Sequence, residues 1–116
     1  MTKKLINLTP HPITIYNQDN NIVMNIPPSG QVARVATIPK IVDSVNGVPI
    51  RQIEYGDIVG LPEPQPDTIY IVSTVVIIAL RAKGINRMDV VSPDTNPDSS
   101  VRDSEGKIIG VRYFQR

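Results

Sequence analysis

The chain has 116 residues, 41% hydrophobic and 20% charged, which fits one folded domain over residues 1–116 rather than a disordered segment. Twelve basic and eleven acidic residues leave a net charge of +1 without a long block of either sign, so we do not expect nucleic acid as a partner. The chain has no cysteine, and its longest apolar run, Val75 to Leu80, is far shorter than the roughly 20 residues of a membrane span. We therefore expect a cytoplasmic protein without disulfides, thiolate metal sites or a membrane anchor.

The N-terminal quarter predicts short strands joined by turns. A first strand is expected from Lys4 to Leu8, and Pro10 and Pro12 end it because each removes a backbone donor. Alternating apolar and polar residues at Ile13 to Tyr16 and at Ile22 to Ile26 flank a polar cluster, which indicates a hairpin.

A second hairpin is the clearest local prediction. A strand from Gln31 to Ile38 comes first, and strands from Ile41 to Val45 and from Val48 to Tyr55 then flank Asn46-Gly47. Asn-Gly suits a type I′ turn, in which both central residues have positive φ. Pro49 places the second strand at an edge or beside the turn.

The next segment predicts a connector, a strand and a helix. Prolines at 62, 64 and 66 favour an extended, stiff connector, although their spacing also matches a proline-rich ligand. A strand follows from Thr68 to Val72, and a buried helix is expected over about 73–83, with Ser73 as N-cap and Gly84 after its end. The β-branched run could instead prolong the strand, but the result would be about three times the usual strand length.

The C-terminal third predicts one more strand, Met88 to Ser92, and a hairpin that turns at Ser104 to Gly106. Two strands joined through a helix are typically parallel, with a right-handed crossover. The expected fold is therefore α+β, or α/β: one small domain of short strands and hairpins, with a single helix in a strand-helix-strand unit.

A candidate site follows from the parallel strands, because ligands of open α/β sheets bind beyond the carboxyl ends of the strands. The free N–H groups of a helix start suit an anion. If the first strand is a parallel neighbour, its loop reaches the same edge. The candidate ligand-binding residues are Thr9, His11, Ser73, Thr74, Asp94 and Thr95, with Arg87 and Arg102 as nearby cations.

Each of these residues also has a simpler interpretation. Ser73 can serve only as a helix cap, His11 as a turn residue and Asp94 as the first residue of an Asx turn. The arginines can pair with surface acids such as Asp89. A triad of His11, Ser73 and Asp94 lacks the small flanking residues of a nucleophile elbow, and one histidine without an acidic cluster predicts no metal site and no cofactor.

Several motifs along almost the whole chain carry a family resemblance. They are LTPHPI near the N-terminus, GLPEPQ and YIVS in the middle, and VRDSEGKIIGVR near the C-terminus. On these motifs the chain resembles a family of small uncharacterised proteins encoded by phages, prophages and bacterial genomes. The resemblance implies a mobile-element gene, and for a phage protein the host cytoplasm. It also raises the prospect of action on host defence, for example by sequestering a nucleotide signal, and implies no catalytic residue.

Three functions follow as expectations. The first is non-enzymatic binding of a small anionic, nucleotide-like ligand at the predicted edge. The alternative is a protein-interaction or virion-accessory module that uses its hairpin edges to contact a host or phage protein, or a second copy of itself. The third is a small hydrolase that uses His11.

Overall fold

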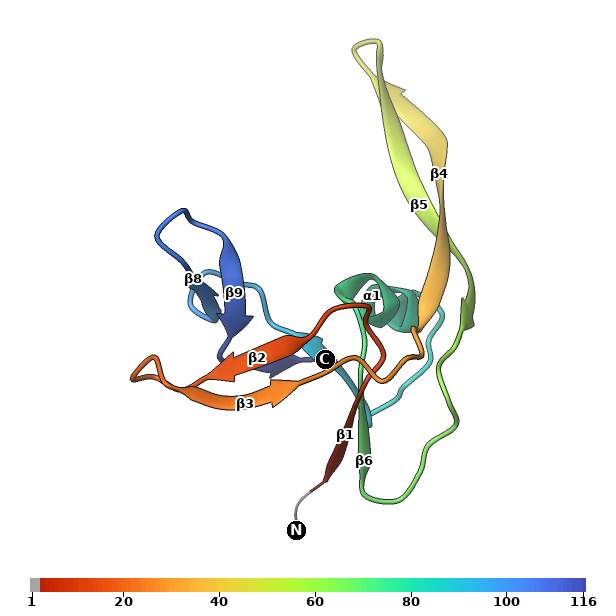
Figure 1. Ribbon diagram of the computed structural model, residues 1–116. Helices are drawn as coiled ribbons and strands as arrows, with labels where there is room; N and C mark the ends of the chain where they lie inside the picture. The colour runs from red at the N-terminus through yellow and green to blue at the C-terminus, as the bar shows by residue number, and fades with distance from the viewer. Residues whose placement is uncertain (1–2) are drawn as a thin grey trace.

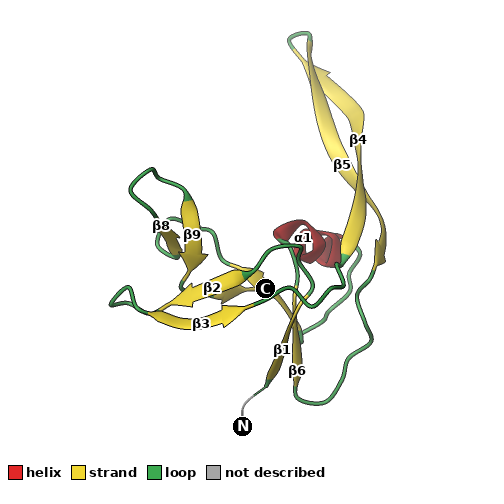
Figure 2. Cartoon of the chain, viewed as in Figure 1, coloured by secondary structure: helices red, strands yellow, loops and turns green. Residues whose placement is uncertain are grey.

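The computed structural model describes residues 3–116, so Met1 and Thr2 of the expected domain lie outside the described residues. The elements are β1 Lys4–Asn7, β2 Ile13–Tyr16, β3 Ile22–Ile26, β4 Arg34–Val45, β5 Val48–Val59, β6 Thr68–Ile71, α1 Thr74–Ala82, β7 Val90–Pro93, β8 Ser100–Arg102, β9 Ile108–Val111 and β10 Phe114–Gln115. Strands dominate, as Figures 1 and 2 show. The expectation of a small β-rich fold with one short helix is confirmed, while the label α+β fits only loosely.

The first sheet has the strand order β1-β6-β7-β10. Strand β6 pairs in parallel with β1 on one side and with β7 on the other, and β10 closes the sheet antiparallel to β7. The chain passes from β6 to β7 through α1, so the predicted strand-helix-strand unit is confirmed. Strand β1 is a parallel neighbour of β6, so the loop after the first strand reaches the same edge of the sheet, as was expected for that case.

The second sheet has the order β3-β2-β9-β8 and combines two hairpins. Strands β2 and β3 form the predicted N-terminal hairpin, and β8 and β9 form the C-terminal one. The two hairpins join through a short parallel pairing of Ile15 with Val111. Residues almost a hundred positions apart in sequence therefore share one sheet.

The first sheet lies between two apolar layers. On its helix side, Tyr70, Val72 and Val90 pack with the buried face of α1 and with Ala33. On its other side, Ile71 and Val91 pack against Ile13 and Ile26 of the second sheet. The alternation of side chains along β6 and β7 thus supplies both halves of the core.

Helix α1 covers nine residues, nearly as expected, but it is less deeply buried than its apolar sequence suggests. Val76, Ile77, Ala79 and Leu80 face the core, whereas Val75 is 37% and Ile78 43% exposed. The expectation of a buried helix therefore holds for one face, because only the first sheet and the base of β4 and β5 cover α1. Within residues 3–116 no helix is long and apolar enough to cross a bilayer.

Strands β4 and β5 form an antiparallel ribbon that projects away from the rest of the molecule (Figure 1). We call residues 34–59 the arm. The sequence predicted its Asn46-Gly47 turn, and both residues have positive φ, but it predicted two separate strands where β4 is continuous. Pro39 does not break β4, because both strands of a two-stranded ribbon are edges and a proline can face outward.

Candidate functional site

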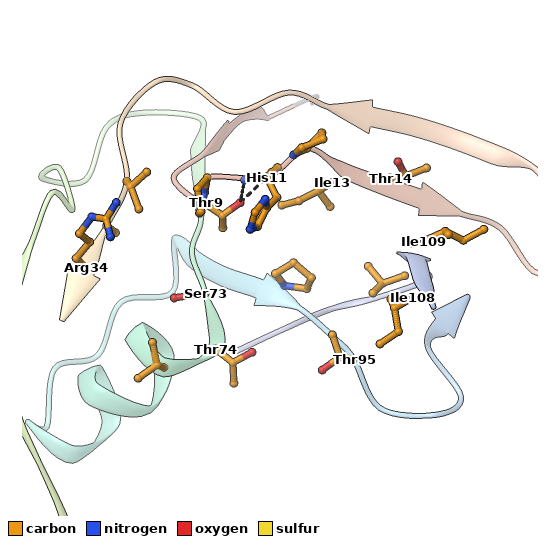
Figure 3. Close-up of a pocket in the computed structure, with 18 of the residues that line it drawn as sticks. Thr9, His11, Ile13, Thr14, Arg34, Ser73, Thr74, Thr95, Ile108 and Ile109 are labelled. Atoms are coloured by element: carbon orange, nitrogen blue, oxygen red, sulfur yellow. Dashed lines mark hydrogen bonds between the residues drawn. The ribbon is translucent and has the colours of Figure 1, made fainter. Parts of the chain in front are cut away.

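A cavity of about 710 Å³ opens where the parallel strands β1, β6 and β7 end (Figure 3). Loops that follow the three strands reach it, as the sequence predicted for a shared carboxyl edge. Five predicted residues line this cavity: Thr9, His11, Ser73, Thr74 and Thr95. The volume lies within the range of about 300–1,000 Å³ that is typical of small-molecule sites.

The loop after β1 is held by Asn7, which is 1% exposed. Its Nδ2 donates to the carbonyl of His11 at 2.8 Å and to that of Ile26 at 3.2 Å. Its Oδ1 accepts from the backbone N–H of Thr9 at 2.9 Å and from the Thr9 hydroxyl at 2.7 Å. Asn7 therefore fixes the backbone that carries His11, and the Thr9 hydroxyl serves the loop rather than a ligand.

The imidazole of His11 is exposed, and among residues 3–116 it forms no hydrogen bond. Figure 3 shows the ring pointing from the loop into the cavity. Both ring nitrogens are thus free to meet a ligand. No hydrogen bond joins His11 to Ser73 in the described residues, so nothing there activates a serine hydroxyl as a nucleophile.

The start of α1 forms a second wall of the cavity, with Ser73, Thr74 and Val75. Ser73 occupies the N-cap position, as predicted, but its side chain makes no capping hydrogen bond. The first turn contains no acidic residue. Ser73 and Thr74 therefore bring two hydroxyl-bearing residues to the cavity wall at the N-terminus of α1, whose first turn has no carboxylate that would repel an anion.

Arg34 contributes the charge that sequence reasoning missed. It is the first residue of β4 and lines the cavity together with Val32, Ala33 and Val35. Figure 3 shows it at one end of the cavity, with Ile108 and Ile109 of β9 at the other. Within residues 3–116 its guanidinium makes no salt bridge and no hydrogen bond. The sequence placed Arg34 on a strand but gave no signal that this strand starts beside the loop after β1.

The complete wall is mixed in character, with many apolar residues. It consists of Thr9, Pro10, His11, Pro12, Ile13, Thr14, Val32, Ala33, Arg34, Val35, Ser73, Thr74, Val75, Pro93, Thr95, Ile108, Ile109, Gly110 and Val111. Among residues 3–116, the wall contains no aspartate and no glutamate, and Arg34 is its one permanent cation.

Asp94 does not line the cavity, although its neighbours Pro93 and Thr95 do. Its carboxylate accepts hydrogen bonds from the backbone N–H and the side-chain amide of Asn96, at 2.9 and 2.7 Å. This is the Asx turn that the sequence offered as its simpler interpretation. Ser92, just before Pro93, is fully buried, and its hydroxyl has no hydrogen-bond partner among the described residues.

Arg87 does not line the cavity because it precedes β7 and so lies near the amino end of that strand. Its guanidinium binds Asp89 through two hydrogen bonds of 2.8 Å and donates to the carbonyl of Pro62 at 3.0 Å. The hydrogen bond from Arg87 lowers the pKa of Asp89, against the opposing effect of burial. The same hydrogen bond raises the pKa of Arg87. Arg87 is thus part of a structural ion pair.

Arg102 does not line the cavity either. It lies on β8 and donates a hydrogen bond to the carbonyl of Gly106 in the turn of its own hairpin. Neither it nor Arg87 adds a positive charge to the cavity wall. Residues 3–116 contain no group of three or more His, Cys, Asp or Glu side chains that could hold a metal ion.

The fold and the cavity together describe a β-rich domain with an open, acid-free site at the ends of three parallel strands. Comparison of the chain with protein-family models, with curated proteins and with solved structures finds no significant match. What the site does must therefore be argued from its own residues.

Proposed function

We propose that the protein binds a small anionic, nucleotide-like ligand in this cavity without altering it chemically. The observation that carries the proposal is the composition of the wall, which contains Arg34 and no carboxylate. An anion that enters it meets one unpaired guanidinium and no like charge. A carboxylate-bearing wall would instead favour a cation.

The polar groups of the wall are of the kinds that bind an anionic group. The N-terminus of α1 offers free N–H groups and a partial positive charge, which together suit phosphate or carboxylate oxygens. The hydroxyls of Ser73 and Thr74 lie at the same end of the helix, and Ser73 is not used as a cap. Arg34 approaches from the base of the arm and can offer two parallel N–H donors to such a group.

The apolar part of the wall supports a ligand with a ring system. Pro10, Pro12 and Pro93 add rigid, flat surfaces, and Ile108 and Ile109 close the end opposite Arg34 (Figure 3). A phosphate alone would leave this surface unused. A nucleotide would place its charged end near Arg34 and α1 and its base against the prolines and isoleucines.

The context that the family resemblance implies gives this binding a role. A phage protein that retains a nucleotide signal would lower the concentration of that signal in the host and so weaken defence. Hydrolysis through His11 remains the third candidate, because within residues 3–116 the His11 ring has no hydrogen-bond partner that would orient it as a general base. A protein-interaction role has separate support in the exposed apolar side chains of the arm.

The test is calorimetric titration and thermal shift with inorganic phosphate, mononucleotides and cyclic dinucleotides as probes. A ligand at 100 times its Kd stabilises the fold by about 2.7 kcal/mol, a shift of several degrees in Tm. Arg34→Gln should weaken binding roughly tenfold or more, because a charge-assisted hydrogen bond contributes about 1.5–3 kcal/mol.

Arg51→Gln is the matched control, since Arg51 is an exposed arginine of the arm that does not line the cavity. It should bind the same probe as the unaltered protein does. Equal affinities for the two variants would refute the role of Arg34. A panel without any response would refute the anionic-ligand proposal itself.

A further inference from the structure

The arm exposes apolar side chains along its whole length. Eight large apolar residues of the arm are exposed, from 41% at Ile50 to 69% at Ile41: Ile38, Ile41, Val42, Val45, Val48, Ile50, Ile53 and Val59. The described chain buries Val35 and Ile58 at the base of the arm only partly, against the helix side of the core. Beyond that base, no part of residues 3–116 covers the arm (Figure 1).

Both faces of the ribbon carry apolar side chains, but they differ in charge. The register pairs Val45 with Val48 and Ile38 with Glu54, which places Val48 and Ile50 on one face with Ile38 and Val45. Ile53, opposite Pro39, lies on the other face, as does Ile41 opposite Arg51. The first face also carries three charged residues, Lys40, Asp43 and Glu54, whereas Arg51 is the one charged residue that the register places on the second. A ribbon on the surface of a monomer usually keeps one polar face, so the second face is the one that needs cover.

The accessible surface of the molecule also indicates that part of it is covered by a partner. Its accessible surface is 7811 Å², whereas a compact chain of 12.8 kDa exposes about 6,300 Å². Its radius of gyration is 16.6 Å, against about 13 Å for a compact domain of this length. The excess surface of about 1,500 Å² per chain lies within the range that each subunit of an obligate homodimer buries, about 1,000–2,500 Å².

The partner must be present whenever the protein is folded, because an isolated two-stranded hairpin is at best marginally stable in water. A second copy of the chain meets this condition at every concentration at which the protein is made. The charges of the arm also suit a copy of itself. Three basic residues, Arg34, Lys40 and Arg51, balance three acidic ones, Asp43, Glu54 and Asp57. Two neutral arms approach without net repulsion, whereas a nucleic acid or an anionic membrane would favour a basic surface.

The edges of the arm are less suited to binding than its faces. Pro39 and Pro49 each lack a backbone donor, and the register shifts near Val42 and again between Val35 and Thr37. Prolines and bulges are the devices that keep exposed strands from adding further strands. The arm is therefore built for packing of side chains across its faces, which closes with two copies, and not for open-ended extension of a sheet.

We propose that the arm is a dimerisation element, in which the arms of two copies pack face to face through the face that carries Ile41 and Ile53, with Pro39 and Pro49 beside them. The interface is isologous, and each arm contributes the same residues to it. This proposal does not depend on the ligand of the cavity.

The experiment measures mass in solution by sedimentation equilibrium and by native mass spectrometry of the full chain. The unaltered protein should have twice the 12.8 kDa mass of one chain. Ile41→Lys should weaken self-association at least tenfold, because it places a charge in the apolar interface. Ile22→Lys is the matched control, since Ile22 is 62% exposed on β3, outside the arm, and this variant should remain a dimer.

A second readout uses the absence of cysteine, which makes any introduced thiol unique. In a dimer, Ile41→Cys should react with iodoacetamide at least tenfold more slowly than Ile22→Cys. A monomeric unaltered protein would overturn the proposal. So would a dimer whose mass resists Ile41→Lys and whose Ile41→Cys thiol reacts as fast as that of Ile22→Cys.

Discussion

Replacing Asn7 by alanine tests the element that shapes the cavity. The side chain is 1% exposed and makes four hydrogen bonds, with Thr9, His11 and Ile26 as partners. Each buried polar group left unpaired costs about 1–3 kcal/mol. The Thr9 hydroxyl can still donate to the carbonyl of His11, which lies 3.0 Å away, so one or two groups are lost outright. The expected loss of unfolding free energy is about 2–4 kcal/mol.

The assay is thermal and urea unfolding followed by circular dichroism, at one fixed protein concentration because self-association would shift Tm. For a chain of this length the loss corresponds to a fall in Tm of roughly 8–15 °C. The control is Asn25→Ala, since Asn25 is exposed and accepts one long hydrogen bond, 3.3 Å, from Thr14. Its effect should stay within about 0.5 kcal/mol. If both variants unfold alike, Asn7 does not organise the loop.

Three further predictions concern stability. The hydrogen bond from Arg87 lowers the pKa of Asp89 in the folded protein. The pair therefore stabilises the fold fully above the unfolded-state pKa of that carboxyl, and this stabilisation is lost as pH falls through the lower folded-state pKa. Asp89→Asn should therefore flatten the acid side of a plot of Tm against pH, and an unchanged slope would contradict this. Gly60 and Gly30 both have positive φ, of 80° and 97°, but only at Gly60 would an added Cβ atom meet a backbone carbonyl. Gly60→Ala should therefore lower Tm more than Gly30→Ala does. Equal losses of Tm would show that the positive φ alone sets the cost. Ser73→Ala should change the unfolding free energy by less than about 0.5 kcal/mol, because Ser73 makes no capping bond; a loss of about 1 kcal/mol in urea unfolding would show that it does cap the helix.

The local elements were predictable because their signals are local. The Asn46-Gly47 turn, the hairpin of β2 and β3, and the helix after β6 each follow from residues within one short segment. The parallel order of β1, β6 and β7 follows from the rule for strand-helix-strand connections, together with the condition set on the first strand. That order brings Thr9, His11, Ser73, Thr74 and Thr95 to one cavity.

The remaining walls of the cavity were not predictable, because they depend on long-range pairing. Ile108 and Ile109 reach the cavity only because β9 pairs with β2, and Arg34 does so only because β4 starts beside the loop after β1. Arg87 does not lie near the carboxyl edge of the sheet, as was expected, because it comes just before β7 and therefore lies near the amino end of that strand. Its pairing with Asp89, two residues further on, is a local interaction that the sequence offered as the simpler interpretation.

The segment that leads into the arm links the two proposals physically. Ala33 is buried in the helix side of the core, Val35 packs against it, and Arg34 between them lines the cavity. One continuous segment therefore forms both a part of the cavity wall and the root of the arm. A change at Arg34 can act on the ligand, on the arm or on both, which is why its binding test needs the mass of the variant beside the affinity. If Arg34→Gln loses the ligand while the dimer persists, the guanidinium acts on the ligand itself. If both are lost together, the cavity depends on the arm being held by its partner.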